Sequence, residues 1–223
     1  MAEYSPSEIR QIRQVLLRWG RSHFADFPWR TEEDPWLALV AEVLLQRTRA
    51  SIVSDVFERF GRQYPTPESA AAATDKELKS IIGGLGLHWR IPLVRRLAQE
   101  IVLYRGVPND LDALQSLPGV GPYAAAAYLS LHAGRRAVII DANVVRWLCR
   151  MTGSLMHGET RRQLWVRELA DALTPPRAFR NHNYAVLDFT MQICAAKPRC
   201  EVCPLLRFCD YGMGRLGQVG LTR

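Results

Sequence analysis

Leu117-Pro-Gly-Val-Gly-Pro-Tyr-Ala-Ala-Ala-Ala-Tyr-Leu-Ser-Leu-His-Ala-Gly-Arg-Arg-Ala-Val-Ile-Ile-Asp-Ala-Asn-Val-Val-Arg146 is the segment around which the chain is organised. Gly119 and Gly121 stand directly before a helix-forming run, so the backbone can turn tightly and direct free N–H groups at an anion such as a phosphate. After Gly134 an apolar run leads to Asp141, which opens a second helical pattern over residues 142–151. The segment predicts a carboxylate beside a phosphate-binding turn. The alternative is that Asp141 is a helix N-cap without chemistry.

The composition is that of a soluble globular protein with a basic surface. The 223 residues are 48% hydrophobic and 23% charged, with a formal net charge of +7. A basic chain favours a polyanionic partner, although this balance alone is weak evidence for nucleic acid. No signal-peptide pattern is present, and no apolar run reaches the roughly 18 to 20 residues of a membrane helix, so no membrane partner is expected.

Helical periodicity dominates the chain, and strand-like alternation is nearly absent. Residues 137–140 are the only strand candidate and are too short to define a sheet. The sequence therefore predicts an all-α protein. Helices are expected over residues 5–22, 36–49, 51–60, 75–82, 90–105, 142–151, 160–173 and 181–193, with a helical hairpin starting at 110–114.

Glu42 interrupts an otherwise apolar run, residues 37–45, within one expected helix. Burial of an ionised carboxylate is costly unless the group is paired or protonated, so a lone Glu in this setting indicates a functional role. The alternative is that Glu42 faces solvent on a helix whose other sides are apolar.

Four of the five cysteines lie within sixteen positions near the C-terminus. Cys149 stands alone in a helical run and is interpreted as a buried small hydrophobe. In a reducing compartment, four clustered thiols indicate metal ligation rather than disulfides. Four thiolates can hold one zinc ion or an iron–sulfur cubane. Zinc ribbons use two Cys-x-x-Cys units and this chain has one, which favours iron and sulfur; the four residues are Cys194, Cys200, Cys203 and Cys209.

The hairpin, its aspartate and the cysteine loop together resemble the DNA glycosylase superfamily that includes endonuclease III and the adenine mismatch glycosylases. The resemblance implies that Gly119, Val120 and Gly121 form the DNA-binding hairpin and that Asp141 is catalytic. It also implies that the four cysteines hold a 4Fe–4S cluster of structural role. The chain departs from the family in one place, with five residues instead of six between the first two cysteines. Lys197 and Arg199 keep that shortened loop basic and suited to backbone phosphates.

The resemblance implies a two-domain helix-hairpin-helix glycosylase fold. Residues 30–136 would form a helical barrel domain that carries the hairpin. Residues 1–29 and 137–223 would form a second helical domain with the cluster loop at 194–209. DNA would bind between the two domains.

Further DNA-contacting residues follow from the same resemblance. Residues 41–48, Ala-Glu-Val-Leu-Leu-Gln-Arg-Thr, resemble the helix of mismatch-specific members, in which the glutamate enters the base pocket. Gln46, Arg47 and Thr48 would face the duplex. In the Gly-rich segment 83–90, Leu87 or His88 would be a wedge into the base stack, and the alternative is a flexible connector.

The expected reaction is removal of a base that has been flipped out of the duplex. Its oxocarbenium-like transition state is cationic, and the charge of Asp141 would stabilise it or activate the attacking water. Glu42 would be a proton donor or hydrogen-bond partner to the departing base. Tyr123 stands where strand-cleaving members carry a lysine nucleophile, which predicts base removal without efficient strand cleavage. The alternative for Tyr123 is packing against Tyr128.

The target base expected from the resemblance is thymine or uracil opposite guanine. Arg47 in Gln-Arg-Thr, Leu87 after Gly86, and Ala142 after Asp141 all depart from the adenine enzymes. The chain also ends fourteen residues after Cys209, which leaves no room for the domain with which adenine enzymes recognise 8-oxoguanine. The alternatives are an adenine glycosylase and, from another class, a non-catalytic helix-hairpin-helix protein. We expect a monomer acting on double-stranded DNA in a bacterial or archaeal cytosol, associated with the nucleoid.

Overall fold

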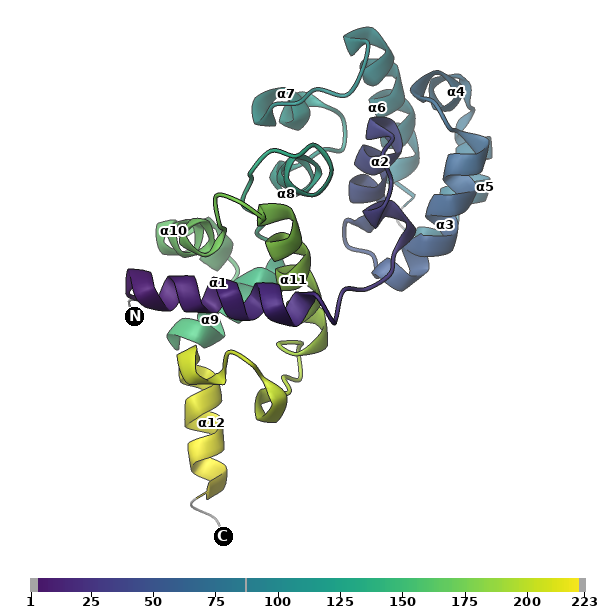
Figure 1. The fold of residues 1–223 in the computed structure, drawn as a ribbon. Coiled ribbons are helices and arrows are strands. Elements are labelled where there is room, and N and C mark those ends of the chain that lie inside the picture. The colour runs from purple at the N-terminus through teal and green to yellow at the C-terminus, as the bar shows by residue number, and fades with distance from the viewer. Residues whose placement is uncertain (1–3, 87, 221–223) are drawn as a thin grey trace. The chain divides into compact units, whose positions relative to one another are not determined.

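A computed structural model describes residues 4–86 and 88–220, with side chains up to Arg215. The described residues are helical and contain no strand, so the predicted all-α class is confirmed (Figure 1). Residues 137–140 belong to no helix and no strand. No helix among the described residues is both long and apolar enough to span a bilayer.

The chain divides into two compact units, one formed by residues up to Ala25 together with Arg136–Arg223, and one by Asp26–Arg135. We call them the terminal unit and the central unit. From the sequence, we expected the boundaries between the two domains to lie between residues 29 and 30 and between residues 136 and 137.

The central unit consists of seven α-helices and three short helical turns. They are η1 (Pro28–Arg30), α2 (Pro35–Leu45), α3 (Ala50–Gln63), α4 (Pro67–Ala72), α5 (Asp75–Ile82), η2 (Gly83–Leu85), α6 (Arg90–Tyr104), α7 (Leu111–Ser116), α8 (Pro122–Ala127) and the π-helical η3 (Tyr128–His132).

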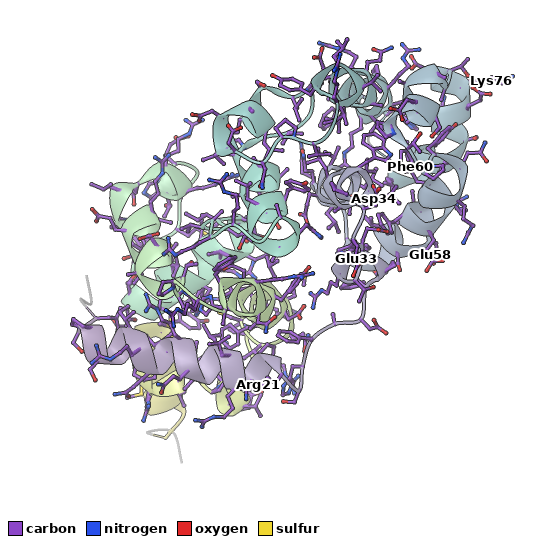
Figure 2. The ribbon with its side chains drawn as sticks, turned by 45° about the horizontal axis from the view of Figure 1, so that its top comes forward. Arg21, Glu33, Asp34, Glu58, Phe60 and Lys76 are labelled. Atoms are coloured by element: carbon purple, nitrogen blue, oxygen red, sulfur yellow. The ribbon has the colours of Figure 1, made fainter. Side chains whose placement is uncertain are left out.

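Helix α2 is the buried centre of this unit. It begins at Asp34, whose carboxylate accepts a hydrogen bond from the Leu37 backbone N–H at 3.0 Å. Eight of its eleven residues are buried, because α3, α6, α8, η1 and η3 all pack against it. Helix α3 is amphipathic, with Phe60 directed into the core and Glu58 outward (Figure 2). Because α2 is buried on nearly every side, its sequence is apolar apart from Glu42.

The terminal unit contains the remaining helices. They are α1 (Pro6–Gly20), α9 (Ala142–Thr152), η4 (Thr160–Arg162), α10 (Leu164–Leu173), α11 (Phe179–Gln192), η5 (Cys200–Val202), η6 (Leu206–Phe208) and α12 (Asp210–Gly220).

Helix α1 has the predicted capping signal, since Ser5 and Glu8 form a capping box in which each side chain binds the other residue's backbone N–H. Ile12 and Leu16 are fully buried and α1 packs closely along α11. The approach is tight at Gly20, where a Cβ atom would lie 2.7 Å from that of Ala185. Any larger residue at position 20 would push the two helices apart.

Two predicted helix boundaries differ from the structure by four residues each. Helix α2 ends at Leu45 instead of residue 49, because Arg47 has a left-handed backbone with φ of 56°. The helix expected from residue 160 begins at Leu164 instead. There the Thr160 side chain accepts a hydrogen bond from the His157 N–H, and Gln163 is extended. Both breaks depend on local turn contacts that periodicity does not detect.

Candidate active site

The hairpin of the central unit is closed by a type II turn. Gly119 has φ of 78°, and the Val120 N–H donates to the Leu117 carbonyl at 3.1 Å. Pro at the second and Gly at the third position are the residues that this turn requires. Val120 is buried. Gly121 begins α8, and no atom lies within 4 Å of the Cβ position that a larger residue would fill there.

The end of α2 is fixed against this hairpin and against α6. The Gln46 Nε2 donates to the Gly119 carbonyl at 2.8 Å. The buried Arg90 donates through Nη1 to the Leu44 carbonyl at 2.8 Å and through Nη2 to the Thr48 hydroxyl at 3.1 Å. Of the three residues expected to face a duplex, Gln46 and Thr48 thus have structural partners inside the unit, whereas Arg47 is exposed.

Glu42 is buried within α2 and is paired with a histidine that the sequence did not single out. Its Oε1 lies 3.0 Å from Nε2 of His132, and both side chains are nearly inaccessible. The interpretation of Glu42 as solvent-facing is therefore wrong. A buried carboxylate with an imidazole partner satisfies the requirement that a buried charge be hydrogen-bonded. His132 carried the same signal as Glu42, since it is one polar residue within an apolar helical run.

The Gly-rich segment after α5 bends at Gly86, whose φ is 78°. Leu87, one of the two expected wedge residues, lies outside the described residues. His88 is exposed, and so is Trp89, whose ring lies 5.8 Å from the Arg90 guanidinium carbon.

Tyr123 occupies the second position of α8 and is half-buried. Lysine occurs three times in the chain, at positions 76, 79 and 197. None of the three lies in α8 or in the hairpin turn.

Asp141, in the terminal unit, caps α9 and heads a chain of hydrogen bonds. Its Oδ1 accepts from the Val144 backbone N–H at 2.7 Å, and its Oδ2 accepts from the Asn143 amide at 2.8 Å. The Asn143 Oδ1 in turn accepts from Arg146 Nη1 at 2.9 Å. The expected N-cap role is confirmed, and the carboxylate is oriented through both oxygens.

Two arginines of α9 hold the first part of the cysteine loop. Arg146 donates through Nη2 to the Cys194 carbonyl at 3.0 Å and to the Thr190 carbonyl at 2.9 Å. Arg150 donates to the carbonyls of Ala195 at 2.6 Å and Ala196 at 3.0 Å. Because α9 begins at Asp141, one helix connects the candidate catalytic carboxylate to this loop.

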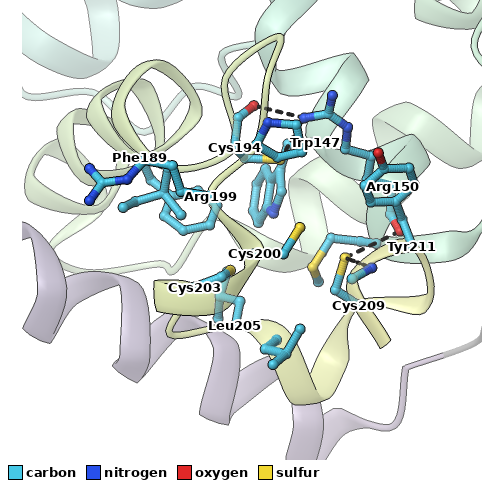
Figure 3. A pocket seen from close by; sticks show the side chains of 15 residues that line it. Trp147, Arg150, Phe189, Cys194, Arg199, Cys200, Cys203, Leu205, Cys209 and Tyr211 are labelled. Atoms are coloured by element: carbon cyan, nitrogen blue, oxygen red, sulfur yellow. Dashed lines mark hydrogen bonds between the residues drawn. The ribbon is translucent and has the colours of Figure 1, made fainter. Parts of the chain in front are cut away.

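The four clustered cysteines line a single cavity in the terminal unit (Figure 3). The space between its walls is about 340 Å³, part of it open to solvent. Apolar walls come from Trp147, Phe189 and Leu205, and Arg150 and Arg199 add positive charge. Burial raises the pKa of the Cys203 thiol to about 12 and also raises that of Cys194. Cys149 lies in the core and is not part of the cavity wall, as its sequence setting indicated.

Beyond the cysteines, the structure brings Gln46 together with the hairpin at Gly119, and Glu42 together with His132. The basic loop residues Lys197 and Arg199 are exposed. His132, Arg90, Asn143, Arg146 and Arg150 were missed by sequence reasoning. A buried arginine such as Arg90 leaves no local signal, because its partners lie more than forty residues away.

The Pro-Gly turn joins α7 and α8 as the two helices of a helix-hairpin-helix motif. The helix that follows them, α9, is capped by Asp141. The model of the HhH-GPD superfamily of base excision DNA repair proteins matches residues 40–168, which include Glu42, the hairpin and Asp141. The chain belongs to this superfamily.

Similar proteins extend the match beyond these residues. A thymine/uracil-DNA glycosylase of Pyrobaculum aerophilum is 39% identical over 208 residues, covering 89% of this chain and 90% of the relative. The structure of a thermostable thymine-DNA glycosylase matches with a TM-score of 0.85 and 32% identity, over 93% of this chain and 98% of the other. A trapped covalent complex of endonuclease III with DNA matches with a TM-score of 0.83 and 25% identity, over 96% and 100%.

Proposed function

We propose that the protein is a mismatch-specific DNA glycosylase that removes thymine or uracil opposite guanine from double-stranded DNA. The observation that carries this proposal is the near full-length similarity to a thymine/uracil-DNA glycosylase at 39% identity. Arg47, Leu87 and Ala142, which depart from the adenine enzymes, support the same substrate. The match includes both carboxylates to which we give roles, and this favours an enzyme over a non-catalytic binding protein.

Asp141 is proposed to stabilise the cationic sugar as the glycosidic bond breaks. A fixed negative charge contributes most when it needs no reorganisation during the reaction. The hydrogen bonds from Val144 and Asn143 support this role, because they hold the carboxylate in one orientation. The same oxygens could orient the water that attacks the sugar.

Hydrolysis without strand cleavage is proposed from the residue at position 123. A neutral phenol cannot form an imine with the sugar, so Tyr123 closes the route that a lysine would open. The three lysines of the chain stand outside α8, and Lys76 and Lys79 lie on the exposed side of α5.

Four cysteines around one cavity are the ligand set that a 4Fe–4S cluster uses. We propose that Cys194, Cys200, Cys203 and Cys209 hold the cluster, which would supply structural support to the loop. The positive charge of Arg150 and Arg199 suits the negative charge of a cluster held by four thiolates.

DNA contacts are proposed for exposed groups of both units. The backbone at Gly119, Val120 and Gly121 would bind a phosphate, and Lys197 and Arg199 would bind others. Arg47 and His88 are exposed and would face the duplex, together with Leu87 as the alternative wedge. We propose that one copy of the chain acts alone on its DNA.

The test is single-turnover base release from four duplexes that differ only in one pair: G:T, G:U, G:A and 8-oxoguanine:A. We expect release from G:T and G:U, with an intact strand until alkali is added. Release from the adenine duplexes alone would establish the adenine alternative. Binding to all four duplexes without release from any would establish the non-catalytic alternative.

The cofactor proposal has its own test. Purified protein should be brown and contain about four iron atoms per chain. From the resemblance to cluster-containing glycosylases we also expect broad absorption at about 400 nm. Stoichiometric zinc without iron would refute it.

A further inference from the structure

The pair formed by Glu42 and His132 joins two elements of the central unit. Glu42 is 1% exposed in α2, and His132 is the last residue of the π-helical turn η3. The Ala133 N–H donates to the Tyr128 carbonyl at 3.0 Å, the i to i+5 bond of that turn. Single π-helical turns are rare and frequent at functional sites. Here the turn carries the imidazole whose Nε2 lies 3.0 Å from Oε1 of Glu42.

The surroundings indicate which of the two groups holds the proton. His132 Nδ1 is buried and has no hydrogen-bond partner among the described residues. If Glu42 were protonated and donated to Nε2, the imidazole would carry its own proton at Nδ1, and that buried N–H would have no acceptor. If Nε2 carries the proton and donates to Oε1, only an acceptor lone pair at Nδ1 is left unpaired. Buried N–H groups without a partner are the rarer case in proteins, so the second arrangement is favoured, in which His132 donates and Oε1 of Glu42 accepts.

Charges on the neighbouring elements agree with an ionised Glu42. The elements that pack against α2 carry Arg30 on η1; Asp55, Glu58, Arg59 and Arg62 on α3; Arg90, Arg95, Arg96 and Glu100 on α6; and Tyr123 and Tyr128 on α8 and η3. The charged residues of α3 are all exposed. Arg90 is the buried cation of the central unit, and no second buried carboxylate occurs among that unit's described residues. Nothing there repels a negative charge on Glu42.

We propose that His132 is a positioning residue that donates to Oε1 of Glu42, so that the second carboxylate oxygen is held as a hydrogen-bond acceptor toward the flipped base. Oε2 makes no hydrogen bond to another described residue, and it is not among the fully buried unpaired atoms. An acceptor recognises a base edge that offers an N–H, as N3 of thymine and uracil does. Adenine has only acceptors at its ring nitrogens and carries its donor on the exocyclic N6, so the same carboxylate would have to meet a different part of that base. This inference rests on the proposed function, in which Glu42 meets the base.

The test compares His132→Ala with His132→Gln, whose amide can still donate to Glu42. Single-turnover release from G:U and G:T duplexes would be followed between pH 5.5 and 8.5. His132→Ala should be slower by about 10- to 100-fold, the range expected when a hydrogen bond to a charged group is lost. The pH profile of His132→Ala should also differ in shape from that of the parent, because the hydrogen bond from Nε2 to the carboxylate is lost. His132→Gln should stay within about threefold of the parent and keep the parent's pH profile.

A purely structural histidine predicts a different outcome. Both variants would then lose activity together with folding stability, and neither pH profile would change shape; that result would overturn the proposal. A His132→Ala protein with the parent's rate and profile would overturn it as well.

A second measurement does not depend on activity. In ¹⁵N-histidine NMR of the DNA-free parent, the signals that disappear in His132→Gln should belong to an Nε2–H tautomer. An Nδ1–H tautomer would mean that His132 cannot donate to Glu42 and would overturn the proposal. If the parent released no base from any duplex, the proposed function would fail, and the tautomer would still decide whether His132 donates to Glu42.

Discussion

His182 should make the terminal unit sensitive to acid. Its side chain lies within α11 and is 1% exposed. Burial lowers its pKa from about 6.5 to about 4, with a smaller push in the same direction from Arg13, while a hydrogen bond with Asn183 opposes the change. The folded protein therefore keeps this imidazole neutral at pH values where an unfolded chain would protonate it.

The direction and the size of this effect on stability follow from the difference in proton binding between the folded and the unfolded chain. Above pH 6.5 the imidazole is neutral in both states, so His182 has no effect on stability there. Between pH 6.5 and pH 4 the unfolded chain binds a proton that the folded chain does not, and each pH unit lowers the free energy of unfolding by up to about 1.4 kcal/mol. Between pH 7.5 and pH 5 the loss amounts to about 2 kcal/mol. For a chain of this length that is a fall in Tm of about 4 to 8 °C.

The measurement is the difference in Tm between pH 7.5 and pH 5 for the parent and for His182→Gln. The variant should lose about 4 to 8 °C less than the parent on acidification, whatever its stability at pH 7.5. The control is His157→Gln, which changes an exposed histidine and should leave the difference as in the parent. Equal acid sensitivity in the parent and His182→Gln would show that His182 protonates at its ordinary pH in the folded state, and would refute the reasoning.

Three further predictions concern the hairpin and Asp141. Asp141→Asn should keep mismatch binding and the N-cap but lower single-turnover base release by about 10² to 10³; an unchanged rate would assign the role elsewhere. Tyr123→Lys should introduce strand cleavage, and borohydride should trap a covalent DNA adduct that the parent forms only weakly; equal trapping by the parent would contradict hydrolysis without cleavage. Gly119→Ala should cost about 1 to 2 kcal/mol because φ is positive, whereas Gly121→Ala, at φ of −83° with open space around it, should leave the Tm unchanged and weaken DNA binding.

Local sequence signals predicted most of the helices. Ser5 and Glu8 gave the start of α1, and Asp141 gave the start of α9. Helix α5 lies at the predicted residues 75–82. Each of these signals acts within one turn of the helix, where capping and periodicity are decided by neighbouring residues.

These local signals do not predict contacts between residues that are far apart in the sequence. The contact of the buried Arg90 with the Leu44 carbonyl joins two helices whose residues are far apart in the sequence. The position of Glu42 within an apolar run predicted a special role for this residue. Its partner His132 could not be predicted in the same way, because it lies ninety residues later in the chain. Nothing local indicated that the Gln46 amide, which is expected to face DNA, also donates to the Gly119 carbonyl.

The shortened cysteine loop can be understood from the same long-range contacts. Arg146 and Arg150 bind the carbonyls of residues 194–196, so the first half of the loop is fixed to α9. The Arg199 N–H donates to the Ile193 carbonyl at 2.9 Å and closes the loop at its other end. A loop with one residue fewer must therefore absorb the change between these points, at residues 197 and 198. The four cysteines line the cavity, so we expect the change to fall on Lys197, which we also expect at a phosphate. The five-residue spacing should thus alter DNA affinity and its salt dependence more than it alters ligation of the cluster.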